Sequence, residues 1–318
     1  MALLIEEGGV NNIMEYGDEV SPEEALEYYI KAGRIAYRVL NETIRLVKPG
    51  IRVLELCEFS ERKIKEYGGK PAFPTNISIN NVAAHYTSPI GDNTIVPEDG
   101  VVKVDIGVQV NGFIADIAKT VTLNPNYEDM VEAVEAALEN ALTIAKPGIR
   151  ISELSKVIEE TIKRYGYKPI RNLSGHEVKR YSLHAGTSIP NVKTFSLEKL
   201  KPWHTYAIEP FATNGAGYVR DSKEIYIYSL RKVRKPQSKI EEKIISKVKS
   251  EYKWLPFSER WLVELAKPDT LRRILRSLAR RGILQGYPVL IEGLNGIVVQ
   301  AEHTILVTDK DIIVITKP

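Results

Sequence analysis

The chain has 318 residues, of which 43% are hydrophobic and 27% charged, and its formal net charge is +3. This length allows one large or two ordinary domains with an ample core, and so small a net charge does not by itself indicate a nucleic-acid partner. The single cysteine, Cys57, excludes an intramolecular disulfide framework and is expected to be buried filler in a reducing compartment.

We expect no export signal at the N-terminus, because residues 1–10 lack a basic region and an adequate apolar region. No stretch of the chain approaches the ~20 apolar residues of a membrane span, so we expect a cytoplasmic protein without membrane contact. Residues 1–20 show little periodicity and are interpreted as an N-terminal extension. A helix is predicted from Ser21 to about residue 47, because serine, proline and two glutamates form a start signal. A second helix is predicted over residues 53–67.

Part of this helical region occurs twice. The letters KPGIR at residues 48–52 recur at 146–150, and further identities at the same offset extend as far as Tyr67-Gly68 and Tyr165-Gly166. A gapless match of this length predicts a duplicated helix-helix-strand unit. The alternative is a pair of generic helix hairpins that share a Lys-Pro-Gly stop.

Residues 103–120 read KVDIGVQVNGFIADIAKT, and their apolar runs flank Asn111-Gly112. This pattern predicts a β-hairpin closed by a two-residue type I′ turn. The resulting register places Asp105 and Asp116 as diagonal neighbours on one face. Two carboxylates on an apolar face repel each other and cost desolvation energy. Exposure to water, a shared proton or a bound cation would each remove that cost.

Acidic residues also occur at corresponding positions in the two halves of the chain. After the first copy of the repeat come His85 and a strand with Asp105, and after the second come His184 and a strand that ends at Glu209. An approximate two-fold axis between the halves would bring these acids face to face. Surface acids have no reason to recur at matched strand positions, so the recurrence supports a carboxylate site.

Residues 225–290 differ in character from the rest of the chain. They begin with a basic run that has nine Lys or Arg against three Glu over residues 231–253. Helices are predicted at 258–266 and 268–281, and a strand at 289–291. We interpret 225–290 as a small, winged-helix-like helical insert. Strands are predicted again at 296–307, which includes Glu302, and at 311–316.

Four acids therefore stand in apolar strands, where a lone charge is costly, and one histidine follows a turn-like Ser-Gly pair. Together they offer enough oxygen and nitrogen donors for two divalent ions. The absence of thiolate ligands disfavours a structural zinc site, and the absence of GxxxxGK[ST] and GxGxxG motifs disfavours a nucleotide site. The candidate metal ligands are Asp105, Asp116, His176, Glu209 and Glu302.

This ordered set, with the motifs KVDIG, GFIADIAKT, SGH, AIEPFAT and QAEHT, resembles the five-ligand site of the methionine aminopeptidase/prolidase (creatinase-like) superfamily. The resemblance covers about residues 21–318. The segments NNVAAHY, which contains His85, and LHAG, which contains His184, resemble the methionine aminopeptidase branch. The long insert between Glu209 and Glu302 is typical of its type II, archaeal-like form. Prolidases usually carry a large N-terminal domain, for which residues 1–20 are too short.

The resemblance implies an α/β (α+β) duplicated pita-bread fold with a central antiparallel sheet. Its catalytic domain would comprise residues 21–224 and 291–318, and the insert 225–290 would form a subdomain. The implied activity is removal of the initiator methionine from nascent polypeptides with a small second residue. A hydroxide bridging two divalent metal ions would attack the scissile carbonyl, and the ligand types do not choose among Co, Mn, Fe and Zn.

The resemblance also implies a role for each site residue. Asp105 and Asp116 would hold one metal, His176 and Glu209 the other, and Asp116 and Glu302 would bridge the two. Three of the expected catalytic and substrate contacts are polar: Glu209 as general base and acid, His184 at the substrate carbonyl and His85 at the scissile amide. Phe73 is expected to line the methionine pocket.

Simpler interpretations remain open for several of these residues. His85 and His184 could be core histidines, and Phe73 could be core filler. His303 is expected to have a structural role, because it points to the face of its strand opposite Glu302. His204 has no motif around it and is expected at the surface.

The basic insert favours a second class of function, an RNA- or ribosome-associated binding protein on the same fold. Its phosphate contacts would come from Arg272, Arg273, Arg276, Arg280 and Arg281. The alternative is a solvated basic face, and ribosome docking is also compatible with peptidase activity. A third interpretation is an X-Pro dipeptidase or aminopeptidase P-like enzyme. A monomer is expected from the family.

Overall fold

The structure is a computed structural model that describes residues 20–318, so the predicted extension at 1–20 lies, except for Val20, outside the described residues. Strands β4 (Val101–Val110) and β5 (Phe113–Thr122) form the predicted hairpin, with Gly107 opposite Asp116. Asn111 and Gly112 both have positive φ, as a type I′ turn requires. The predicted register is therefore confirmed, and Asp105 and Asp116 lie on one face of the sheet.

Both copies of the sequence repeat fold as two helices followed by a short strand. The first copy consists of α1 (Pro22–Ile44), α2 (Val53–Glu66) and β1 (Lys70–Pro71), and the second of α3 (Glu128–Ile144), α4 (Ile151–Arg164) and β6 (Lys168–Pro169). Ser21 and Glu24 cap α1 reciprocally, as the start signal predicts. Loop contacts recur as well, because Gly50 donates to the Val96 carbonyl and Gly148 donates to the Leu200 carbonyl. The duplication is thus a structural one.

The larger of two antiparallel sheets joins the halves. Strand β14 (Val298–Val307) pairs with β5 of the first half and with β9 (Thr205–Ile208) of the second. The sheet has 11 strands and includes β2 (Asn76–Ile79), β7 (Ser174–Val178), β8 (Ser188–Pro190), β10 (Phe211–Thr213) and β15 (Ile312–Val314). All its pairings among the described residues are antiparallel, as predicted.

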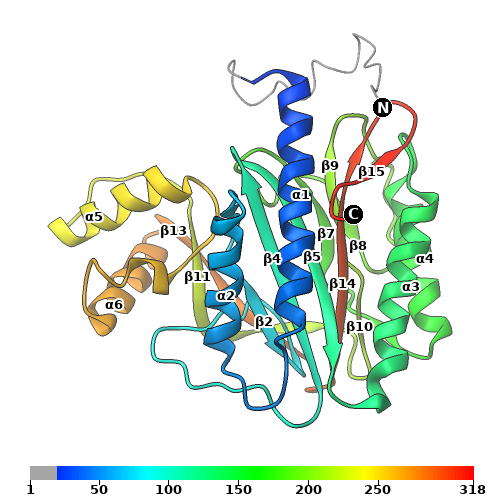
Figure 1. Cartoon of the computed structure of the whole chain (residues 1–318), viewed down its shortest axis with the longest axis horizontal. Helices are drawn as coiled ribbons and strands as arrows, with labels where there is room; N and C mark the ends of the chain where they lie inside the picture. The colour runs from blue at the N-terminus through cyan, green and yellow to red at the C-terminus, as the bar shows by residue number, and fades with distance from the viewer. Residues whose placement is uncertain (1–19) are drawn as a thin grey trace.

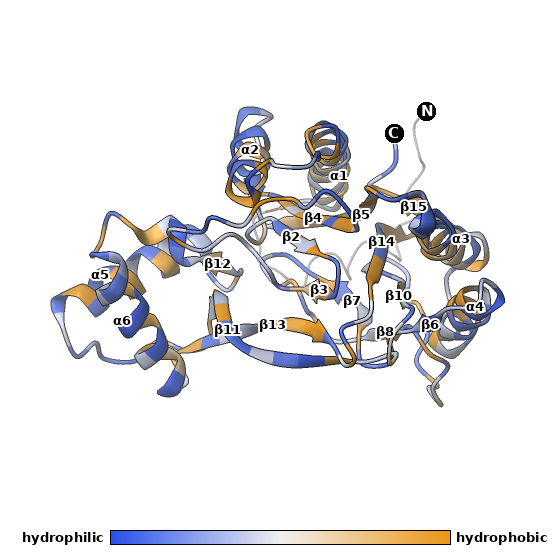
Figure 2. Cartoon of the chain, turned by 90° about the horizontal axis from the view of Figure 1, so that it is seen from below, coloured by the Kyte–Doolittle hydropathy of each residue, from blue (hydrophilic) through white to orange (hydrophobic). Residues whose placement is uncertain are grey.

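Helices cover one face of this sheet (Figure 1). Apolar side chains of α1 and α2 pack on β4 and β5, and those of α3 and α4 pack with β9 and β14. The other face is turned toward a second, four-stranded sheet of β12 (Phe257–Ser258), β11 (Val219–Leu230), β13 (Leu284–Glu292) and β3 (Val82–Ala84), as Figure 2 shows. None of the helices in residues 20–318 is long and apolar enough to cross a membrane.

The insert between β11 and β13 carries α5 (Lys239–Lys247), a π-helical turn (Val248–Tyr252), a 3₁₀ turn (Glu259–Leu262) and α6 (Pro268–Arg280). The helix predicted at 258–266 is wrong. Ser258 instead pairs with Ile227 of β11, and the Arg260 and Trp261 side chains reach Glu61 on α2. These long-range contacts override the helical pattern, while the helix predicted at 268–281 is present as α6. The winged-helix likeness and the domain boundaries remain predictions.

Candidate metal centre and active site

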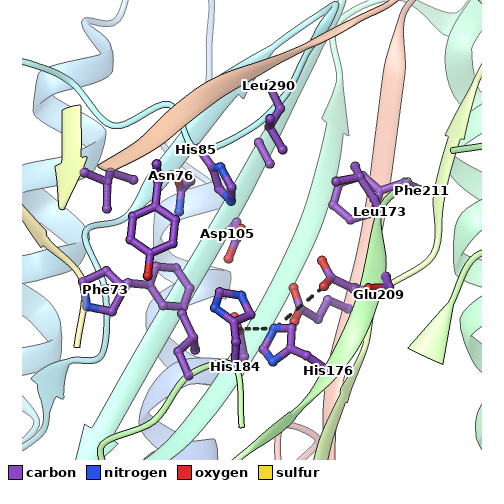
Figure 3. Close-up of a pocket in the computed structure, with 18 of the residues that line it drawn as sticks. Phe73, Asn76, His85, Asp105, Leu173, His176, His184, Glu209, Phe211 and Leu290 are labelled. Carbon is purple, nitrogen blue, oxygen red and sulfur yellow. Dashed lines mark ion pairs between the residues drawn. The ribbon is translucent and has the colours of Figure 1, made fainter. Parts of the chain in front are cut away.

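The five predicted ligands meet at one cavity of about 370 Å³ on the inner face of the large sheet. They arrive from separate elements: Asp105 from β4, Asp116 from β5, His176 from β7, Glu209 from the residue after β9, and Glu302 from β14. Figure 3 shows His176 and Glu209 pointing toward one another, with Asp105 nearby. The hairpin register and the central place of β14 bring acids from both halves of the chain together.

The distances within the cluster suit ligands around a common cation. His176 Nε2 lies 3.8 Å from Asp116 Oδ2 and 3.8 Å from Glu209 Oε1. Asp116, His176 and Glu302 each offer a ligand atom, and these atoms all lie within 4.8 Å of one another. Ligands about 2 Å from a shared metal ion lie at such separations from one another.

Three of the carboxylates have an oxygen that no hydrogen bond satisfies: Oδ1 of Asp105, Oδ1 of Asp116 and Oε1 of Glu302. The contrast is Glu292, which is fully buried but accepts hydrogen bonds from four backbone N–H groups, those of Ala216, Gly217, Leu294 and Gly296. Buried acceptors normally have partners. The unpartnered oxygens therefore fit a group that is not part of the chain, and hard carboxylate donors suit a divalent cation.

Burial raises the pKa of all four carboxyl groups, and neighbouring negative charges raise those of Asp116 and Glu302 further. Burial, together with the charge of His184, lowers the pKa of His176 to about 3, so its imidazole is neutral near pH 7. Of the explanations that the hairpin left open, exposure to water fails for Asp116, which is only 3% exposed, while Asp105 is partly exposed and lines the cavity. Shared protons or bound cations remain, and a neutral imidazole beside the acids favours cations.

Two further histidines lie on the wall of the same cavity (Figure 3). The His184 ring stacks edge-on against that of His176, with 4.5 Å between centroids. His85 lies 5.7 Å from the ring of Tyr287, and its Nδ1 is 3.1 Å from the carbonyl oxygen of Pro288. Burial lowers the pKa of both, for His184 to about 4. They therefore face the candidate centre as neutral rings.

Apolar side chains also line the cavity. In Figure 3 Phe73 lies on the opposite side of the cavity from Leu173 and Phe211. The Phe73 ring rests on Gly107, where a Cβ atom would come within 2.2 Å of it, so the glycine of KVDIG makes room for this ring. Sequence reasoning missed two other wall residues, Pro256 and Tyr287, because they come from the insert and β13, and no local pattern links them to the site.

Comparison with known proteins decides the family, because residues 27–309 match metallopeptidase family M24. The chain belongs to this family. It is 46% identical over 297 residues to the methionine aminopeptidase of Methanocaldococcus jannaschii, across 92% of this chain and 99% of that protein. The corresponding protein of Saccharolobus solfataricus is 45% identical over 297 residues, across 93% and 99%.

Solved structures agree on the fold. The methionine aminopeptidase of Thermotoga maritima has a TM-score of 0.68 at 23% identity and covers 94% of this chain and 98% of that one. A thermophilic Arx1 has a TM-score of 0.81 at 19% identity, with coverage of 92% and 91%. The prolidase of Pyrococcus furiosus has a TM-score of 0.59 at 22% identity and covers 93% of this chain but 64% of that one. The predicted pita-bread fold with its antiparallel sheet is thus confirmed.

The remaining histidines of this M24 metallopeptidase lie outside the cavity lining. His303 Nδ1 is 2.9 Å from the Thr316 hydroxyl, which agrees with the predicted structural role. The prediction for His204 is wrong, since it is half-buried and its Nδ1 lies 2.6 Å from Glu177 Oε1. The other Glu177 oxygen accepts a hydrogen bond from Thr187 N. Glu177, next to His176, thereby ties His204 to the loop that carries His184.

We predict that the chelated protein loses more stability than the Mn²⁺-loaded protein as pH rises above about 7. The four carboxyl pKa values are higher in the folded chain than the unfolded values of about 4, so folding is favoured at low pH and this contribution is lost as pH rises through the folded values. The lowered histidine pKa values act in the opposite direction only below about pH 6.5. Burial lowers the pKa of Lys103 to about 7, so Lys103 also acts in the opposite direction above pH 7, but it is not a proposed ligand and contributes equally with and without metal. The measurement is Tm from pH 7 to 9, with chelator and with Mn²⁺.

Mn²⁺ should abolish most of this fall in Tm, because the cation replaces the protons. Asp116→Asn should reduce the fall in chelator, while Glu160→Gln, a change at an exposed acid on α4, should leave it intact. A Tm that is equally insensitive to pH with and without Mn²⁺ would contradict the strained carboxylate cluster.

Proposed function

We propose that the protein is a metal-dependent aminopeptidase that removes the N-terminal methionine from nascent polypeptides whose second residue is small. The observation that carries the proposal is one cavity that combines the five ligand side chains, two neutral histidines and an apolar wall. The 46% identity to a methionine aminopeptidase over nearly the whole of both chains supports it. New polypeptides as substrates place the protein in the cytoplasm, and we propose that it acts as a monomer.

We propose two divalent ions as cofactors, drawn from Co, Mn, Fe and Zn. Asp105 and Asp116 would hold one, His176 and Glu209 the other, and Asp116 and Glu302 would bridge them. The unpartnered oxygens of three of these acids support the assignment. When bound, such ions polarise a scissile carbonyl and make a water molecule acidic near neutral pH.

The protein's own groups would manage the protons and the oxyanion. Glu209, whose pKa is raised by burial and by the charge of Asp105, is suited to take a proton from the attacking water and return it to the leaving amine. His184 is neutral and has one N–H, which would donate to the substrate carbonyl oxygen as negative charge develops there.

His85 would contact the scissile amide as an acceptor. A backbone carbonyl oxygen only accepts hydrogen bonds, so the contact between His85 Nδ1 and Pro288 O places the proton on Nδ1. In the neutral ring Nε2 is then an acceptor, which suits the N–H of the scissile amide. His85 would therefore orient the bond to be broken and assist the leaving group.

The apolar wall fits a methionine side chain better than a charged or polar one. Phe73, Leu183 and Tyr287 line the cavity beside the two histidines. Burial of a methionine side chain contributes about 2 kcal/mol to binding. An X-Pro peptidase on this fold would act through the same ligands, so substrate choice separates the two activities.

We predict that chelated protein regains cleavage of Met-Ala-Ser when a divalent metal is added, and does not cleave Ala-Pro peptides. Asp116→Asn should abolish cleavage, because it removes a ligand from both proposed metal positions. His184→Ala should lower kcat by about 10²–10³-fold, the cost of one oxyanion donor. His303→Gln, at a histidine that lies outside the cavity lining, should leave kcat nearly unchanged. The measurement is product release by liquid chromatography at each metal concentration.

Cleavage of only the prolyl peptide would move the protein to the prolidase branch. No cleavage with any metal by a folded protein would contradict the peptidase proposal.

A groove in the insert supports a second, compatible role, docking to ribosomal RNA. It has a volume of about 720 Å³ and is lined by one acid, Asp269, and five cationic side chains: Lys223, Arg272, Arg273, Arg276 and Arg280. Two of the arginines assigned to phosphate from the sequence have other partners, since Arg272 pairs with Glu259 and Arg281 with Glu241. The docking proposal therefore rests on Arg273, Arg276 and Arg280.

We predict that replacing these three arginines with glutamine weakens binding to ribosomal RNA. The fall of the log of the binding constant with the log of the salt concentration should become less steep, by about three. The matched control replaces three exposed lysines of the opposite part of the molecule, Lys146, Lys156 and Lys163, with glutamine. If both triple variants bind ribosomal RNA equally well, or if the wild type does not bind it at physiological salt, the docking proposal is contradicted. The groove is then a solvated basic face.

A further inference from the structure

We propose that the insert positions His85 by clamping the loop that follows it. The clamp consists of two ion pairs, Glu61 with Arg260 and Glu259 with Arg272. The inference rests on the proposed function, because it assigns the clamp an effect on a histidine of that active site. It gives the insert a part in catalysis that is separate from any docking role.

The loop needs support from outside itself. Residues 85–92 contain no helix or strand, so their backbone lacks the regular hydrogen bonds that hold neighbouring elements. His85 has φ of 63°, a left-handed conformation that non-glycine residues rarely adopt and that persists only where the surroundings impose it. Ala84, before His85, pairs with Leu290 of β13, and the Tyr86 carbonyl, after it, accepts a hydrogen bond from Ile77 N of β2, so the loop lacks strand pairing from Thr87 onward.

The first ion pair fixes the loop beyond Tyr86, at Thr87 and Ser88. The Arg260 guanidinium binds both oxygens of Glu61 on α2, at 2.7 and 3.1 Å, and its Nε donates to the carbonyl oxygen of Ser88 at 2.6 Å. A further N–H donates to the Thr87 hydroxyl at 3.2 Å. Trp261 Nε1 donates to Glu61 Oε2, so two consecutive insert residues bind the same carboxylate.

This pair is shielded from water. The Arg260 side chain is 9% exposed and that of Glu61 is 7% exposed. A buried two-point contact between guanidinium and carboxylate fixes orientation as well as distance, which a lysine in place of Arg260 could not do. One arginine thus joins the insert, helix α2 and a loop residue three positions after His85.

The second ion pair holds Ile90. Glu259 Oε1 accepts a hydrogen bond from the Ile90 N–H at 3.0 Å, and Arg272 donates to the Ile90 carbonyl oxygen at 2.6 Å. Glu259 and Arg272 are themselves 2.9 Å apart. The ion pair therefore binds both the N–H and the carbonyl oxygen of Ile90, as a neighbouring strand would in a sheet. The two pairs come from adjacent insert residues, 259 and 260, so they act on the loop as one unit.

The test compares Arg260→Met and Arg272→Met with Arg281→Met in the metal-restored enzyme. Arg281 forms a 2.7 Å ion pair with Glu241 within the insert and is the matched control. On Met-Ala-Ser we expect each clamp variant to lower kcat by about tenfold, with KM changed less than about twofold, because bond orientation and not methionine binding is disturbed. Arg281→Met should leave kcat unchanged.

A double-mutant cycle distinguishes positioning from general destabilisation. If the clamp acts through His85, Arg260→Met should change kcat less than about twofold when His85 is already alanine. If the kcat losses of Arg260→Met and His85→Ala multiply in the double variant, the proposal is overturned. A kcat loss in Arg281→Met as large as that in the clamp variants would also overturn it. Should Arg260→Met fail to fold, Arg272→Met carries the same cycle, because the Arg272 side chain is 32% exposed and its loss is milder.

Hydrogen exchange provides a readout that does not depend on activity. The amides of residues 86–91, above all that of Ile90, should exchange about tenfold faster or more in both clamp variants and at the wild-type rate in Arg281→Met. Unchanged exchange in the clamp variants would overturn the clamp. If the clamp variants exchange faster but the wild-type protein cleaves nothing with any metal, the clamp is retained and the proposed function is rejected.

Discussion

The repulsion among four carboxylates that line one cavity governs the rest of this structure. Asp116 and Glu302 are nearly fully buried, and Asp105 and Glu209 are partly exposed and line the cavity. Removing ionised groups from water is costly unless an opposite charge replaces the lost hydration. Nothing in the described part of the chain supplies that charge to their unpartnered oxygens. The sheet therefore holds these acids in an arrangement that becomes favourable when cations are bound.

The duplicated architecture explains how so strained a cluster can be built. Each half folds around its own helix pair, and β14 then joins β5 to β9. The acids come from strands that are each anchored by an apolar core on the far side of the sheet. The cost of gathering the acids is thus offset by packing elsewhere, and the site lies between the halves, where ligands from both copies of the unit converge.

How far the sequence predicts this molecule depends on the range of the interactions. The hairpin of Asp105 and Asp116 is predicted to the residue, because its turn and its alternation are local properties. The helix pairs follow from caps and from the repeat offset. The helix expected at 258–266 fails, because Arg260 and Trp261 are held by Glu61, about two hundred residues earlier in the chain. His204 and Arg272 were misjudged for the same reason, since their carboxylate partners become visible only after folding.

The central claim is that the acids are gathered to bind two cations, and anomalous X-ray scattering tests it most directly. Crystals of the protein, stripped with chelator and then soaked in Mn²⁺, would be measured near the manganese edge. We expect two anomalous peaks per chain within the cavity, one beside Asp105 and Asp116 and the other beside His176 and Glu209. A cavity without such peaks, in a well-ordered protein whose carboxylates meet directly through shared protons, would contradict this claim.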